Sequence, residues 1–231
     1  MQVQPVIQSL HKYARTFHPV VPFTAGKDSL LQMDFTAANK DITEEIYNDI
    51  HTFSAYINGL LEKSGSRYGI GGYNEHRIIY AGSTHFDTGS EPRRLHLGID
   101  IWGEAGTPVF AFTGGRVHSF AFNDNAGDYG ATLILLHQLD GFAFHTLYGH
   151  ISLKDIEKLT GSQYVVRGQR IAHFGNPEEN GHWPPHLHFQ VIIDMELKQG
   201  DYPGVCKYSE REKWLYNCPD PDLILQMNQY I

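Results

Sequence analysis

The feature of the sequence best suited to chemistry is a pair of histidines, His186 and His188, two residues apart. Pro185 precedes them and an apolar run to Ile193 follows, a pattern that predicts a β-strand. Side chains two apart in a strand point to the same face, with Cα atoms roughly 6.5–7 Å apart. Two such imidazoles can share a metal ion, or one can bind it while the other faces a substrate. The spacing alone does not separate these cases from two polar residues on a solvated face.

A second candidate site joins His96 to Asp100, since imidazole and carboxylate are both zinc ligands. Along a straight strand, positions four apart lie about 13 Å apart, too far for one ion. Gly98 between them permits a bend or bulge that brings them together. A helix would have the same effect, but a central glycine followed by Ile99 argues against one. The alternative is a histidine at a loop edge and an aspartate in a turn.

A third candidate is His150, which follows Tyr148 and Gly149 at the end of an apolar and aromatic run. A histidine at the end of a strand is well placed to enter a cleft, although one such residue indicates little alone. His137 lies in an apolar strand pattern, and we expect it to be structural.

The elements that must position these residues are short strands separated by turn residues. The β-rich runs are Thr107–Phe112, Gly115–Phe122, Thr132–His137, Phe142–Tyr148, Gln163–Val166, Arg170–His173 and His186–Ile193. Only Ser152–Leu159 has a helical pattern in this region. The sequence therefore predicts a mainly β protein, with an antiparallel β-sandwich or barrel-like core over residues 93–195.

The N-terminal region, residues 1–92, is predicted to be an extension with one clear amphipathic helix. Its apolar stripe runs from Ile42 to Leu60 at helical spacing, with Gly65 at its end. A weaker helix is predicted over Val6–Tyr13. The glycine-rich segment 64–72 reads as a flexible connection. Residues 196–231 are expected to wrap the core as loops and short helix.

Composition excludes several classes of protein. The chain has 231 residues, a net charge of −8 and 19% charged residues, which indicates a folded domain and disfavours nucleic-acid binding. No apolar run of 18 residues appears, so no membrane insertion is expected. The N-terminus has no pattern of a signal peptide, and Cys206 and Cys218 fit free thiols better than a disulfide. These features predict a cytoplasmic protein.

Taken together, the motifs resemble the lysostaphin/LytM-type zinc metallopeptidases, which are mostly bacterial cell-wall endopeptidases. The resemblance covers residues of about 93–195. It is carried by His96-Leu97-Gly98-Ile99-Asp100-Ile101, Gly106-Thr107-Pro108-Val109, Gly115-Arg116-Val117, Tyr129-Gly130, Tyr148-Gly149-His150, Gly168-Gln169, Ile171-Ala172-His173-Phe174-Gly175 and Pro185-His186-Leu187-His188-Phe189. Several motifs in the right order are more specific than any one of them.

The resemblance implies zinc as cofactor, His96, Asp100 and His188 as its ligands, and His150 and His186 as catalytic residues that do not bind the metal. Three protein ligands leave one open position, which is the arrangement of a catalytic zinc site. The implied activity is zinc-dependent hydrolysis of peptide bonds, on a peptide or a peptidoglycan fragment. Some members are held inactive by an upstream residue at the metal, a role that segment 74–76 is placed to play.

The sequence departs from the family pattern where Trp183-Pro184-Pro185 replaces the usual turn before the last motif. Four segments are similar to the peptidase-like domain that some bacteria fuse to an aminotransferase: Tyr73-Asn74-Glu75-His76-Arg77, Arg94-Leu95-His96, Trp183-Pro184-Pro185-His186 and Cys218-Pro219-Asp220-Pro221. Two alternatives to a metallopeptidase therefore stay open. One is a degenerate metal-binding module without catalysis, and the other is a cytoplasmic amidase-like accessory of amino-acid metabolism. The sequence does not indicate the oligomeric state.

Overall fold

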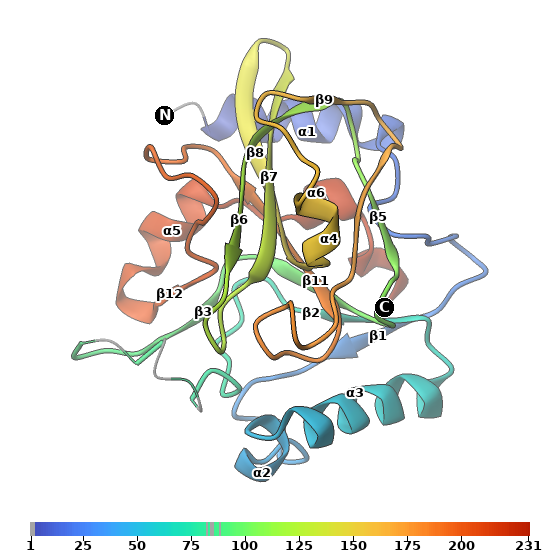
Figure 1. Cartoon of the computed structure of the whole chain (residues 1–231), viewed down its shortest axis with the longest axis vertical. Helices are drawn as coiled ribbons and strands as arrows, with labels where there is room; N and C mark the ends of the chain where they lie inside the picture. The colour runs from blue at the N-terminus through green and yellow to red at the C-terminus, as the bar shows by residue number, and fades with distance from the viewer. Residues whose placement is uncertain (1–2, 82, 84–85, 88) are drawn as a thin grey trace.

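The computed structural model describes residues 3–81, 83, 86–87 and 89–231. Among these residues the largest sheet has eight strands in the order β1-β2-β4-β11-β8-β7-β6-β9. All neighbours are antiparallel except β1 and β2. The prediction of a mainly β, antiparallel fold is confirmed. The sheet ends at β1 and β9 and does not close on itself, so the core is not a barrel (Figure 1).

The strands of this sheet are β1 (Leu30–Met33), β2 (Tyr68–Gly71), β4 (Ile99–Trp102), β6 (Gly115–Asn123), β7 (Gly130–Leu139), β8 (Phe142–Ile151), β9 (Tyr164–Val165) and β11 (His186–Ile192). Two strand pairs lie beside it, β5 (Pro108–Phe110) with β10 (Arg170–His173), and β3 (Arg93–His96) with β12 (Val205–Lys207). The helix expected near Ser152 is a single turn, α4 (Leu153–Ile156).

Strand β11 is central to the fold because it pairs with β4 on one side and β8 on the other. All of its residues are buried, and on one face Leu187, Phe189 and Val191 pack into the apolar core. A slip of one residue would put the histidines on that face, so this packing fixes the register. In that register His188 lies opposite Asp100, and His186 lies opposite Trp102. The expected break between His96 and Asp100 is present, since β3 ends at His96 and β4 begins at Ile99 in a different sheet.

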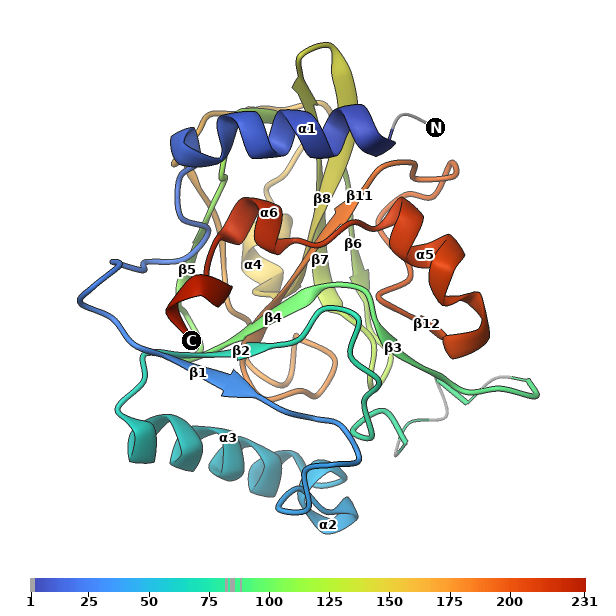
Figure 2. The same ribbon diagram turned by 180° about the vertical axis from the view of Figure 1, so that it is seen from behind.

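The amphipathic helix predicted from Ile42 forms as two helices, α2 (Glu44–Tyr47) and α3 (Ile50–Ser64). Asp49 separates them because its extended backbone and its side chain, which accepts a hydrogen bond from Thr52 N, cap the second helix. As expected, α3 ends at Gly65 in the left-handed conformation. The helix α3 lies below β1 and β2 in Figure 2, and Phe53 packs its ring against those of Trp102 and Trp183.

The segment expected to be a flexible connection contains a buried strand instead, and that prediction is wrong. Strand β2 lies between β1 and β4 in the main sheet. Glycine is needed here for close approach: a Cβ on Gly69 would lie 2.8 Å from the Met33 sulfur, and one on Gly71 would lie 2.7 Å from Arg77 Nη2. The glycines in this segment permit tight packing and do not indicate flexibility.

The two ends of the chain pack against the sheet. The N-terminal helix is α1 (Val3–Tyr13), longer than expected, and Figure 2 shows it lying across β8. A short 3-10 turn at Ala14–Thr16 follows α1. Beyond β12 the chain forms α5 (Arg211–Asn217) and α6 (Asp222–Leu225), with short 3-10 turns at Tyr208–Glu210 and Asn228–Tyr230. Cys206 and Cys218 are buried and free.

None of the helices among the described residues has the length and apolar character needed to cross a membrane.

We expect His137 to make folding stability sensitive to acid. It is buried in β7, with Nδ1 2.9 Å from the Gly114 carbonyl and Nε2 2.7 Å from Thr146 Oγ1, and burial lowers its pKa to about 4. In the unfolded chain the histidine has a pKa of about 6.5, so between pH 6.5 and 4 it binds a proton there but stays neutral in the folded chain. The stabilising contribution of neutral His137 is therefore present above about pH 6.5 and is lost as the pH falls towards 4.

Urea unfolding at several pH values between 7 and 4.5 measures this effect. The free energy of unfolding of His137→Gln should fall less steeply with acid than that of the wild type. The difference in slope should correspond to the uptake of up to about one proton fewer on unfolding. Equal slopes for the two proteins would contradict the prediction.

Candidate metal centre

The five residues singled out by sequence come together at the middle of the fold. His96 is the last residue of β3, Asp100 lies in β4, and His186 and His188 lie in β11. His150 lies near the end of β8, where its backbone takes a positive φ of 60°. All five are at most 6% exposed. They line one cavity of about 130 Å³.

Three of these side chains offer ligand atoms to one point. The ligand atoms of His96, Asp100 and His188 lie within 4.8 Å of one another. His96 Nε2 lies 2.9 Å from His188 Nδ1, and Asp100 Oδ1 lies 3.2 Å from the first nitrogen and 3.0 Å from the second. Gly98 makes this approach feasible, because a Cβ there would lie 2.5 Å from His188 Cε1.

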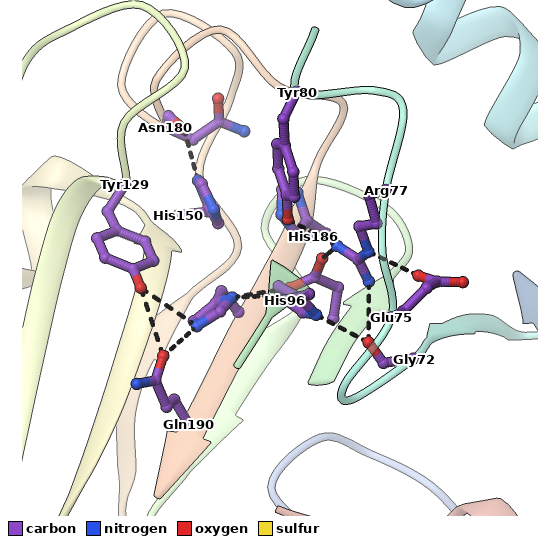
Figure 3. A network of polar contacts seen from close by, with 12 residues as sticks. Gly72, Glu75, Arg77, Tyr80, His96, Tyr129, His150, Asn180, His186 and Gln190 are labelled. Carbon is purple, nitrogen blue, oxygen red and sulfur yellow. Dashed lines mark hydrogen bonds and ion pairs between the residues drawn. The ribbon is translucent and has the colours of Figure 1, made fainter. Parts of the chain in front are cut away.

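Hydrogen bonds on the far side of each imidazole leave the inward nitrogen free to bind a cation. His96 Nδ1 lies 2.9 Å from the carbonyl oxygen of Gly72, which can only accept, so Nδ1 carries the proton (Figure 3). His188 Nε2 lies 2.9 Å from Gln190 Oε1, which is likewise an acceptor. Each histidine therefore presents a lone pair inward, on Nε2 of His96 and Nδ1 of His188. Such outer partners are typical of metal-binding histidines.

Asp100 uses its two oxygens differently. Oδ1 faces the histidines, whereas Oδ2 accepts a hydrogen bond of 2.5 Å from Nη1 of Arg77. Burial alone would raise the pKa of Asp100, but its interactions with His96 and with the Arg77 guanidinium outweigh burial and hold that pKa well below its usual range. Burial lowers the pKa of His96 to about 4. At neutral pH His96 is thus a neutral imidazole and Asp100 a carboxylate, and together with the His188 imidazole they form a donor set that fits zinc.

The other two histidines lie beside this cluster without joining it. The rings of His150 and His186 are 4.1 Å apart, and His186 also stacks on Trp102 at 4.0 Å. The Nδ1 atom of His150 donates to the Asn180 carbonyl at 2.7 Å, and that of His186 donates to the Pro184 carbonyl at 2.8 Å. Both Nε2 atoms are then unprotonated. Burial lowers the pKa of His186 to about 4 and that of His150 well below its usual range.

Tyr129 closes another wall of the cavity. Its hydroxyl lies 3.3 Å from His188 Nε2, and its ring lies 5.5 Å from that of His150. Tyr80, Phe86 and Trp183 also line the cavity, which makes one side of it aromatic.

The structure engages residues 74–76 elsewhere, so the expected blocking role finds no support. Asn74 Oδ1 accepts from Arg211 Nε, Glu75 pairs with Arg77, and the ring of His76 contacts that of Tyr208.

Sequence reasoning missed two residues that contact the cluster, Arg77 and Gln190. Gln190 follows His188 by two positions in β11, so strand periodicity was a signal for it. Arg77 lies 23 residues upstream of Asp100 and no spacing rule connects the two.

Comparison with known proteins identifies the segment that carries the site. Residues 94–200 match peptidase family M23. The resemblance to lysostaphin/LytM-type metallopeptidases is thereby confirmed over this segment, and the match supports a peptidase. All five candidate residues lie within the M23 segment, whereas Gly72, Glu75 and Arg77 lie outside it.

The relatives of the M23 segment are bacterial proteins. The DD-carboxypeptidase/endopeptidase Mpg of Neisseria meningitidis is 30% identical over 131 residues, 54% of this chain and 27% of that protein. The chain thus spans about a quarter of the length of this curated relative. A zinc-containing peptidase of Vibrio cholerae is 30% identical over 43% of this chain and 28% of its own, with a TM-score of 0.35. Lysostaphin of Staphylococcus simulans is 22% identical over 77% of this chain and 54% of its own, with a TM-score of 0.44.

Proposed function

We propose that this chain is a zinc-dependent hydrolase of peptide bonds. The observation that carries the proposal is the convergence of two imidazole lone pairs and one carboxylate oxygen beside two further neutral histidines. His96, Asp100 and His188 would hold the ion. When bound, zinc would supply Lewis acidity at the open position that three protein ligands leave.

The remaining histidines would handle the proton. Neutral Nε2 atoms on His150 and His186 can accept a proton and then donate it to the leaving amine, which is general acid–base catalysis. Their carbonyl partners fix each ring so that Nε2 stays the reacting atom. Once either ring is protonated, it can also stabilise negative charge on the carbonyl oxygen of the substrate. Burial strengthens that interaction because little water competes.

For the substrate we propose peptides of peptidoglycan type. Support comes from the M23 match and from the Neisseria relative, which is named a DD-carboxypeptidase/endopeptidase. The amidase-like alternative is favoured by the small cavity, since about 130 Å³ is below the roughly 300–1,000 Å³ of pockets for drug-sized ligands. Cytoplasmic localisation stays a prediction.

Metal removal tests the proposed function. We expect the purified protein to hold about one zinc per chain, and we expect a chelator to abolish hydrolysis and added zinc to restore it. The fold should survive, because a chain of this size buries a sufficient core without an ion. The assay is release of new amino groups from a panel of dipeptides, longer peptides and peptidoglycan fragments, with circular dichroism in parallel.

The outcomes separate the alternatives. Cleavage of dipeptides alone would favour the amidase-like function, and bound zinc without turnover on the whole panel would favour the degenerate module. Full activity in chelator, in protein that contains no transition metal, would overturn the proposed mechanism.

A further inference from the structure

A cation from outside the M23 segment contacts one of the candidate metal ligands, Asp100, directly. Arg77 is completely buried, which is rare for an arginine unless its charge is paired. Its Nη1 donates to Asp100 Oδ2 at 2.5 Å and to the Tyr80 hydroxyl at 3.0 Å, and its Nε donates to Glu75 Oε2 at 2.6 Å. Figure 3 shows the guanidinium between Glu75 and Tyr80.

The backbone around Arg77 is held against the strand that carries His96. Residues 74–77 run beside β3, with hydrogen bonds from Asn74 N to His96 O, from His96 N to Glu75 O and from Arg77 N to Arg94 O. The Gly72 carbonyl meets His96 Nδ1 in the same segment. Residues 72–77 therefore contact two of the three candidate ligands, while the third is held by Gln190.

Aromatic rings and a glycine surround the guanidinium. Its central carbon lies 5.4 Å from the ring centroid of Phe35 and 5.9 Å from that of Tyr80. Gly71 provides the space for Nη2 by lacking a Cβ. Glu75 accepts from Arg77 Nε through one oxygen and from Phe35 N through the other, so it orients the guanidinium.

The consequence concerns the number of oxygens that Asp100 can give to a metal ion. A carboxylate can bind a cation through one oxygen or through both. Here Oδ2 is occupied by an arginine that is always charged, so Oδ1 alone remains for the ion. A ligand of one oxygen keeps the site at three protein ligands and leaves the fourth position for substrate or water.

We infer that Arg77 is a positioning residue that holds Asp100 as a one-oxygen ligand and thereby keeps the metal site four-coordinate. The inference rests on the metal site proposed above. It also makes residues 72–77 part of the metal centre, although they lie outside the M23 segment.

The test uses zinc affinity and the visible spectrum of the Co²⁺-loaded full chain, because four-coordinate Co²⁺ absorbs much more strongly than five-coordinate Co²⁺. Arg77→Met should weaken zinc binding about 10–100-fold, as loss of an outer-shell partner does. Its Co²⁺ absorption should fall as the second oxygen of Asp100 binds. Arg77→Lys keeps the positive charge but loses the planar, branched guanidinium group. Its zinc affinity and Co²⁺ absorption should therefore lie between those of the wild type and those of Arg77→Met.

Arg67→Met is the matched control. It also removes an arginine–carboxylate pair, with Asp28, but that pair is at the surface beside β2. Its affinity and spectrum should equal those of the wild type. If Arg77→Met does not fold, the zinc affinity and Co²⁺ spectrum of Arg77→Lys test the inference instead.

The outcomes distinguish the two proposals. Arg77 variants that lose thermal stability but keep the wild-type zinc affinity and Co²⁺ spectrum would show a purely structural role and overturn this inference alone. A wild-type chain that binds neither metal, or a His188→Ala variant that binds both as well as the wild type, would overturn the metal site and this inference with it.

Discussion

His188→Ala is expected to lose the metal ion. The imidazole lies opposite Asp100 on the neighbouring strand, and its Nδ1 lies 2.9 Å from His96 Nε2, so its removal leaves two ligands. Loss of an outer partner costs roughly 10–100-fold in metal affinity, and loss of a direct ligand should cost more than that. His96→Ala and Asp100→Ala should lose metal affinity in the same way as His188→Ala. Metal content after dialysis and zinc titration measure the effect.

The control for this series is His182→Ala, which removes an exposed histidine from the loop before β11. It should bind zinc as the wild type does. Circular dichroism on each variant separates loss of a ligand from unfolding. If His186→Ala emptied the site while His188→Ala kept the metal, the assignment within the pair would be reversed.

His186→Ala and His150→Ala are expected to keep zinc and to lose turnover. Neither residue belongs to the group of converging ligand atoms, and both are neutral at neutral pH because burial lowers the pKa of each. Removing the group that moves the proton and stabilises the oxyanion should slow hydrolysis by about 100-fold or more. The measurement is kcat on a cleaved peptide at saturating zinc.

A second comparison guards against an effect of packing alone. His186 stacks on Trp102, so its truncation leaves space in the cavity wall. His186→Gln restores part of that volume but cannot act as a base, and it should stay as slow as the alanine variant. Recovery of activity in His186→Gln would contradict a role in proton transfer.

Strand periodicity and one glycine predicted the local geometry of the candidate site, whereas the roles of its residues came from the resemblance to a family. The alternation around His186 and His188 predicted a strand with both side chains on one face, and β11 confirms the strand. The glycine between His96 and Asp100 predicted a break, and β3 and β4 end and begin around it. These are local properties, because the period of a strand and the freedom of a glycine depend on neighbouring residues only.

Spacing did not decide which histidine of the pair faces Asp100. The register of β11 decides it, with His188 opposite Asp100 and His186 opposite Trp102. Register depends on which apolar side chains fill the two faces of the whole sheet, and these come from strands far apart in sequence. The same holds for the segment 64–72, whose glycines fit against Met33 and Arg77 and thereby form a buried strand.

Arg77 shows most clearly what only the tertiary structure decided. In the sequence it is a charged residue two positions after Glu75, in a segment that is typical of a surface turn. In the fold it is completely buried, and its pKa is raised because Tyr80, Asp100 and Glu75 outweigh the effect of burial. The sequence determined the residue types that can bind a metal. The hydrogen-bond partners that fix the protonated atom and the orientation of each candidate ligand are brought to it by the packing of segments far apart in sequence. A local sequence pattern does not predict which distant segments pack together.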